Sequence, residues 1–203
     1  LFRSQATEYG TLYTLAELEA IRKVCTKYDM PLFIDGARLG YALTATGNDV
    51  TLEDIARIAD VFYIGGTKVG AMFGEAVVFT HGNMPKNFVT LVKQHGALLA
   101  KGWLLGVQFD TLFTDDLYCR IARHANDAAD RIREVLVERG YTLTFDAPTN
   151  QIFITLDNAT SERLQRNVRL GFMEKADDTH TVMRICTSWA TTDEQVEQLI
   201  ALL

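Results

Sequence analysis

The first eighty residues alternate between helical patterns and short apolar runs, and this alternation constrains the fold more than any other feature. Residues 14–28 and 51–58 carry apolar side chains at helical spacing. Each of these segments is followed by the pattern of a buried strand, at 31–34 and 61–64, and a further strand is expected at 75–79. Helices that alternate with strands in this way are typical of an α/β fold with a mainly parallel sheet.

After about residue 80 the pattern changes to long helical segments and then to an α+β unit. Residues 84–113 are predicted to be mostly helical, with breaks at Gly96 and Gly102, and a long helix is predicted over 115–138. The last elements are predicted as strands at 141–145, 151–156 and 182–186 and helices at 161–168 and 193–202, the final helix capped by Thr191 and Glu194. We therefore predict that residues 1–95 form part of a large domain and 96–203 a small C-terminal domain.

Charge and cysteine usage narrow the classes of partner and compartment. The net charge of −6 argues against a nucleic-acid or anionic-membrane partner, and no apolar run approaches the length of a membrane span. Three cysteines, far apart and odd in number, favour a reducing compartment, so we expect a cytoplasmic protein. The sequence begins at Leu1 rather than Met, which leaves open a processed or incomplete chain.

Two turns at the ends of predicted strands carry the groups that could do chemistry. They are Asp35-Gly36-Ala37-Arg38 and Gly65-Gly66-Thr67-Lys68. Ligands of α/β sheets bind at the carboxyl ends of the strands. A carboxylate, a lysine amine and an arginine there suit pyridoxal 5′-phosphate (PLP), because they can protonate the pyridine, form an imine and bind a substrate carboxylate. The same residues also occur as ordinary turn formers and solvated side chains.

Other site types are not supported by the spacing of the residues. The Gly65–Lys68 segment lacks the spacing of a phosphate-binding P-loop, and no Gly-x-Gly-x-x-Gly motif opens a helix. The histidines are scattered, without the helical spacing of paired metal ligands, so no metal site is expected.

Four segments, in order along the chain, resemble one known family. They are Thr7–Tyr13 (TEYGTLY), Ile34–Leu39 (IDGARL), Tyr63–Lys68 (YIGGTK) and Arg184–Trp189 (RICTSW). They are similar to segments of the low-specificity L-threonine aldolases and aromatic-amino-acid β-eliminating lyases. The resemblance implies a PLP enzyme of fold type I, with this chain as the second half of the large domain plus the α+β small domain.

The resemblance also implies roles for particular residues in binding the cofactor. Lys68 would form the Schiff base with PLP, and Asp35 would bind the pyridine nitrogen, so these two residues are the expected catalytic pair. Thr67 would contact the phosphate, and Thr7 would lie near the ring.

The implied substrate is a small amino acid, held through its carboxylate by Arg38 and Arg184. The implied reaction is cleavage of a β-hydroxy amino acid such as L-threonine to glycine and an aldehyde. Ser188 stands where many aldolases have a histidine, and transamination or β-elimination on the same scaffold stays open as an alternative.

One departure from the family concerns what precedes the chain. Family members begin with a long additional segment that carries a glycine-rich phosphate-binding turn, and this chain has none. A homo-oligomer, dimer or tetramer, is expected, with an N-terminal segment or companion chain missing here. A truncated, non-catalytic fragment is the alternative.

Overall fold

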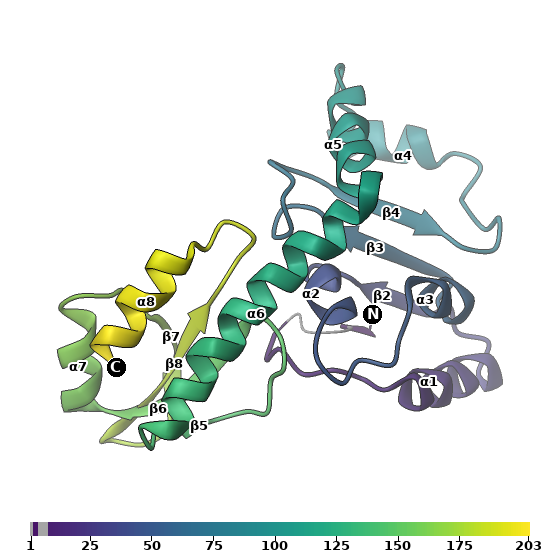
Figure 1. Cartoon of the computed structure of the whole chain (residues 1–203). Helices are drawn as coiled ribbons and strands as arrows, with labels where there is room; N and C mark the ends of the chain where they lie inside the picture. The colour runs from purple at the N-terminus through teal and green to yellow at the C-terminus, as the bar shows by residue number, and fades with distance from the viewer. Residues whose placement is uncertain (1, 4–7) are drawn as a thin grey trace.

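The computed structural model describes residues 2–3 and 8–203, which form two four-stranded sheets joined by one long helix (Figure 1). The first sheet has the order β1-β2-β3-β4. Its strands are β1 (Phe2–Arg3), β2 (Phe33–Asp35), β3 (Val61–Gly65) and β4 (Glu75–Phe79). The first three strands are parallel and β4 runs antiparallel to β3, so the carboxyl ends of β2 and β3 meet the amino end of β4 at one edge.

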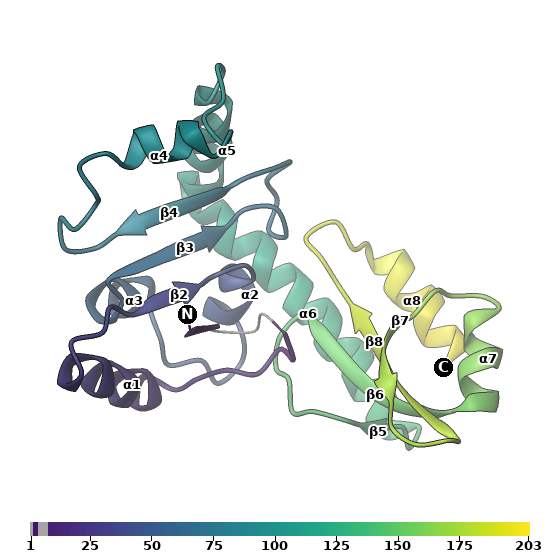
Figure 2. The ribbon, with the colours of Figure 1, turned by 180° about the vertical axis from the view of Figure 1, so that it is seen from behind.

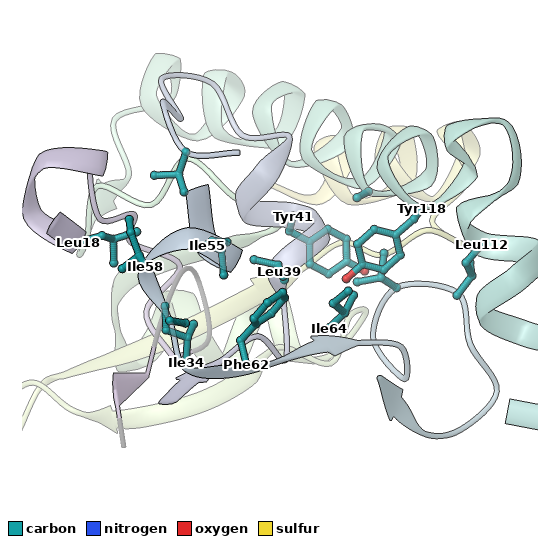
Figure 3. Close-up of a cluster of buried hydrophobic side chains, with 14 of the residues drawn as sticks. Leu18, Ile34, Leu39, Tyr41, Ile55, Ile58, Phe62, Ile64, Leu112 and Tyr118 are labelled. Carbon is teal, nitrogen blue, oxygen red and sulfur yellow. The ribbon is translucent and has the colours of Figure 1, made fainter. Parts of the chain in front are cut away.

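Short helices precede and follow the strands of this sheet. They are α1 (Leu15–Lys27), α2 (Leu39–Leu43) and α3 (Leu52–Ile58). Capping boxes begin α1 and α3: Thr14 pairs with Glu17, and Thr51 pairs with Asp54. The helices cover a core in which Ile34 and Phe62, from the central strands, pack with apolar side chains of the helices (Figure 3).

The predicted helical stretch 84–113 consists of two helices, α4 (Phe88–Gln94) and α5 (Trp103–Phe113). A 3-10 turn at Thr114–Asp116 follows, in which Asp115 and Asp116 have φ of 52° and 56°. This left-handed backbone changes the chain direction between α5 and the long helix α6 (Leu117–Glu138).

Helix α6 spans both halves of the molecule and contributes to both cores (Figure 1). Tyr118, Ala122 and Ala125 pack into the core of the first sheet, whereas Ile132 and Leu136 pack into that of the second. These residues recur at intervals of three, four and seven, so they line one face of the helix. The prediction of a long helix here is confirmed.

The second sheet is antiparallel, with the order β5-β6-β8-β7 (Figure 2). Its strands are β5 (Thr142–Leu143), β6 (Gln151–Asp157), β7 (Gly171–Lys175) and β8 (His180–Cys186). Helices α7 (Asn158–Gln165) and α8 (Asp193–Leu202) pack with α6 on one face, against Ile152, Ile154, Met183 and Ile185. Phe153 and Val182 point to the opposite face, where Phe145 and Tyr9 meet them.

Several boundaries differ from the sequence predictions. Strand β7 was not predicted, and α7 begins earlier because Asp157 caps it through the N–H of Thr160. The predicted cap of the last helix by Thr191 and Glu194 is wrong: Thr192 and Gln195 form the capping box. Strand β2 ends at Asp35, which places the carboxylate inside the strand rather than after it.

The predicted α/β class is confirmed, while the division at residues 95 and 96 stays a prediction. Among the helices of the described ranges, none is both long and apolar enough to cross a membrane.

Candidate active site

Asp35 ends β2, and one of its carboxylate oxygens is held by two donors. The Tyr63 hydroxyl, from the neighbouring strand β3, donates to Asp35 Oδ1, and the Ala37 N–H donates to the same oxygen at 3.0 Å. No hydrogen bond from residues 2–3 or 8–203 reaches Oδ2. Desolvation, reinforced by the bond to Asp35, raises the pKa of Tyr63 well above its usual range, so its hydroxyl stays a donor. The carboxylate is therefore oriented, with one oxygen left to bind a further group.

Two glycines allow the ends of β2 and β3 to approach closely. A methyl group at Gly36 would lie 1.9 Å from the carbonyl oxygen of Tyr63, and one at Gly65 would lie 2.4 Å from that of Ala37. The Gly65 N–H donates to the Gly36 carbonyl at 2.9 Å. Only glycine fits at these two positions, because a Cβ at either one would overlap the backbone that follows or ends the neighbouring strand.

The turn that carries Lys68 is fixed through its backbone by two buried tyrosines. The Tyr118 hydroxyl donates to the Gly65 carbonyl at 2.8 Å and accepts the Gly40 N–H at 3.1 Å. The Tyr41 hydroxyl donates to the Lys68 carbonyl. The Lys68 side chain itself is exposed, and none of the carboxylates in the described part of the chain forms an ion pair with it. The amine is thus presented on a rigid turn.

Thr67, the residue before the lysine, is engaged by a carboxylate. Glu75 begins β4 opposite Gly65, and its two oxygens accept the Gly66 N–H at 2.8 Å and the Thr67 hydroxyl at 3.0 Å. These two donors lie together at the end of β3, where an anion could bind. In this structure the Glu75 carboxylate accepts both hydrogen bonds.

A second group of side chains comes from the face of the second sheet that also carries Phe153 and Val182. Arg184 and Cys186 lie two residues apart on β8 and so project to the same face. Arg184 Nη1 donates to Gln151 Oε1 at 3.2 Å, and Gln151 is fully buried on β6, opposite Cys186. No carboxylate of the described ranges forms an ion pair with Arg184. Its Nε is buried and donates no hydrogen bond to any described residue.

Arg38, at the N-cap of α2, joins this group from the first sheet. Burial lowers the pKa of Arg38 from its ordinary value, and the nearby charge of Arg184 lowers it further. Desolvation of the sulfur raises the pKa of the Cys186 thiol, against the opposing effect of both guanidinium groups. Two cations that repel each other in a partly desolvated place form a favourable site for an anion such as a carboxylate.

The structure places Asp35 at the end of β2 and Thr67 and Lys68 in the turn after β3. Arg38 and Arg184 lie close enough for the charge of Arg184 to lower the pKa of Arg38. Thr7 lies outside the described residues. Sequence reasoning missed the side chains that hold these groups, namely Tyr41, Tyr63, Glu75, Tyr118 and Gln151. A tyrosine in an apolar helix or strand is usually a core residue, so the sequence carried no signal for the contacts of the three tyrosines.

Comparisons with known proteins show which family and which structures this chain resembles. Residues 3–159 match the model of the family described as beta-eliminating lyase. The low specificity L-threonine aldolase of Pseudomonas aeruginosa is 32% identical, over 97% of this chain and 56% of that protein. A threonine aldolase structure from Leishmania major is 42% identical with a TM-score of 0.95, over 98% of this chain and 58% of that one.

A more distant structure shows how widely the fold is shared. An aspartate aminotransferase of Thermus thermophilus is 16% identical with a TM-score of 0.70, over 99% of this chain and 55% of that one. The fold is that of the fold-type-I PLP enzymes, as predicted, and the chain spans a little over half the length of the relatives it matches. With the family match extending over most of its residues, this chain belongs to the beta-eliminating lyase family.

Proposed function

We propose that the chain is part of a PLP-dependent lyase that cleaves a β-hydroxy amino acid, such as L-threonine, to glycine and an aldehyde. Family membership and the similarity to threonine aldolases support this proposal. The single observation that carries it is the oriented Asp35 carboxylate beside the turn of Lys68. One oxygen is bound by Tyr63 and Ala37, and the other accepts no hydrogen bond from the described residues.

The residues present fit PLP. The exposed Lys68 amine would hold the aldehyde of the cofactor covalently, and the open oxygen of Asp35 would bind the protonated pyridine nitrogen. When bound, PLP supplies an electron sink for the pair left on Cα as a substrate bond breaks. The tyrosine contacts to Gly65 and Lys68 would keep the amine in place without using its nitrogen.

Arg38 and Arg184 would bind the carboxylate of the amino acid and so orient its Cα. Their mutual repulsion is relieved by an anion between them, which favours binding of the substrate over a neutral molecule. Gln151 holds Arg184 through one nitrogen, leaving the rest of the guanidinium for a bound carboxylate.

Thr67 is proposed to contact the phosphate, and Thr7 to lie near the ring. For Thr67 this requires its hydroxyl to leave Glu75, to which it donates in this structure. Because the chain spans just over half of its relatives, we expect full activity only in the longer protein, as a cytoplasmic homo-oligomer.

The experiment uses the full-length protein loaded with PLP. Borohydride reduction followed by peptide mapping should find the cofactor attached to Lys68, and incubation with L-threonine should release glycine and acetaldehyde. Lys68→Ala should abolish both the trapped label and the release of products. The control Lys23→Ala changes a lysine of α1, away from the strand ends that carry the site, and should keep both. A label on another lysine, or an oxo acid formed in place of the aldehyde, would refute the proposed reaction.

A further inference from the structure

Gln151 is a buried amide whose oxygen faces the Arg184 guanidinium. It begins β6 and pairs with Cys186 across the sheet, whereas Arg184 pairs with Phe153, two residues further along β6. The side chains of Gln151 and Arg184 are therefore diagonal neighbours on one face of the sheet. Arg184 Nη1 donates to Gln151 Oε1 at 3.2 Å, and the Cys186 thiol lies 4.0 Å from the same oxygen.

The nitrogen of the same amide binds the segment that precedes α1. Gln151 Nε2 donates to the Glu8 carbonyl at 3.4 Å. This segment lies directly against the second sheet, because the Thr149 hydroxyl donates to the Gly10 carbonyl at 3.1 Å and a Cβ at Gly10 would lie only 2.7 Å from that hydroxyl oxygen. A backbone carbonyl only accepts and a guanidinium only donates, so the amide satisfies both in one orientation. Gln151 thus links the segment around Glu8 to Arg184.

The acceptor that Gln151 offers to Arg184 carries no charge. No carboxylate of residues 2–3 and 8–203 forms an ion pair with Arg184, so its positive charge stays uncompensated by the part of the chain that the structure describes. A glutamate at position 151 would have nearly the same shape but would place an anion beside the guanidinium. A bound carboxylate would then have to compete with this internal one for Arg184.

We propose that Gln151 is a positioning residue that makes the site selective for a carboxylate. Its neutral amide ties Arg184 to the segment around Glu8 and leaves the charge of the arginine for the ligand. This role rests on the proposed function, in which Arg184 binds the carboxylate of the amino acid. It assigns selectivity to a residue that holds the arginine rather than the substrate.

The test is the binding of glycine and glycinamide to the full-length protein loaded with PLP, followed by the change in cofactor absorbance. Glycinamide has a neutral amide in place of the carboxylate. Gln151→Glu should weaken glycine binding about 10-fold or more, because the new carboxylate pairs with Arg184, and should leave glycinamide binding unchanged. Gln151→Met, which keeps the length of the side chain but removes its hydrogen bonds, should weaken glycine binding about 2- to 10-fold, again without an effect on glycinamide.

The matched control is Gln165→Glu, which adds the same charge at an exposed residue of α7 and should bind both ligands as the wild type does. Equal weakening of glycine and glycinamide in Gln151→Glu would indicate general damage to the site and overturns the selectivity. Unchanged glycine binding in Gln151→Met overturns the positioning role, and a wild-type protein that binds the two ligands equally overturns both.

The titration needs no turnover, so it separates this inference from the proposed reaction. A wild-type protein that prefers glycine but does not cleave L-threonine loses the proposed function, while the two Gln151 variants still decide the role of the amide. If Gln151→Glu does not fold, Gln151→Met decides: weaker glycine binding with unchanged glycinamide binding supports the role, and any other pattern overturns it.

Discussion

Tyr63 and Asp35 lie on neighbouring parallel strands, and the hydroxyl of Tyr63 donates a hydrogen bond to Asp35 Oδ1. The Ala37 N–H donates to the same oxygen, so among the described residues the hydrogen bonds to this carboxylate all reach Oδ1. An oriented carboxylate needs no rearrangement when it meets its ligand, which lowers the cost of binding. The pair thus prepares Asp35 for the pyridine nitrogen that we propose it binds.

Tyr63→Phe should weaken PLP binding by about 2- to 10-fold, because one of the two donors to Asp35 Oδ1 is lost while the ring remains. Fluorescence titration of the full-length apoprotein with PLP measures this. Tyr28→Phe, at an exposed tyrosine after α1, serves as the control and should bind PLP as the wild type does. Equal affinities for all three proteins would show that Tyr63 does not prepare the site.

Glu75→Gln should tighten PLP binding about fivefold, if Thr67 contacts the phosphate. The Glu75 carboxylate accepts the Gly66 and Thr67 donors and would repel a phosphate there. Two like charges about 4 Å apart in water repel each other by ~1 kcal/mol. Removing this repulsion gives the roughly fivefold gain in affinity. The gain should shrink in high salt. Weaker binding would show instead that Glu75 supports the turn and that Thr67 is not a phosphate ligand.

Gly36→Ala should destabilise the protein by about 1–3 kcal/mol or more, because the new methyl group would overlap the Tyr63 carbonyl. Urea unfolding of the full-length protein gives the free energy. Gly106→Ala is the matched control: this helical glycine has open space around it, so alanine there should stabilise the protein by about 0.5–1 kcal/mol. Equal effects of the two changes would contradict the close approach of the strand ends.

The buried phenol of Tyr41 predicts a loss of stability at alkaline pH. Desolvation raises its pKa to about 12, above the value of about 10 expected in the unfolded chain. The folded state therefore holds this proton more tightly; its contribution is complete below about pH 10 and is lost as the pH rises towards 12. Arg38 and Cys186 are the nearby groups that modulate the shift. Urea unfolding between pH 9 and 11 should show a smaller decline for Tyr41→Phe than for the wild type, and parallel declines would contradict the assignment.

The elements with the strongest periodicity were predictable, and the contacts between them were not. Helix α6 has apolar residues at helical spacing, and β3 is a short apolar run, so both could be recognised from their own residues. The glycines and the lysine after β3 mark a turn at the end of a strand. Strand β7 (Gly171–Lys175) exposes most of its side chains, so its sequence has no apolar pattern that would predict a strand. The partners of Asp35 and Lys68 come from residues 28 and 27 positions away, and such pairs are set by tertiary packing rather than by local sequence.

Arg184→Lys should raise the KM for L-threonine about 10-fold or more and leave PLP trapping on Lys68 intact. Lysine keeps the charge but loses the planar fork that can bind Gln151 and a carboxylate together. Steady-state kinetics and borohydride trapping on the full-length protein separate the two effects. Arg166→Lys, at the exposed C-cap of α7, changes an arginine outside the proposed carboxylate site and should keep the wild-type KM. Were both variants to bind threonine equally well, the carboxylate would have to be held elsewhere, and the assignment of the second sheet to substrate binding would fail.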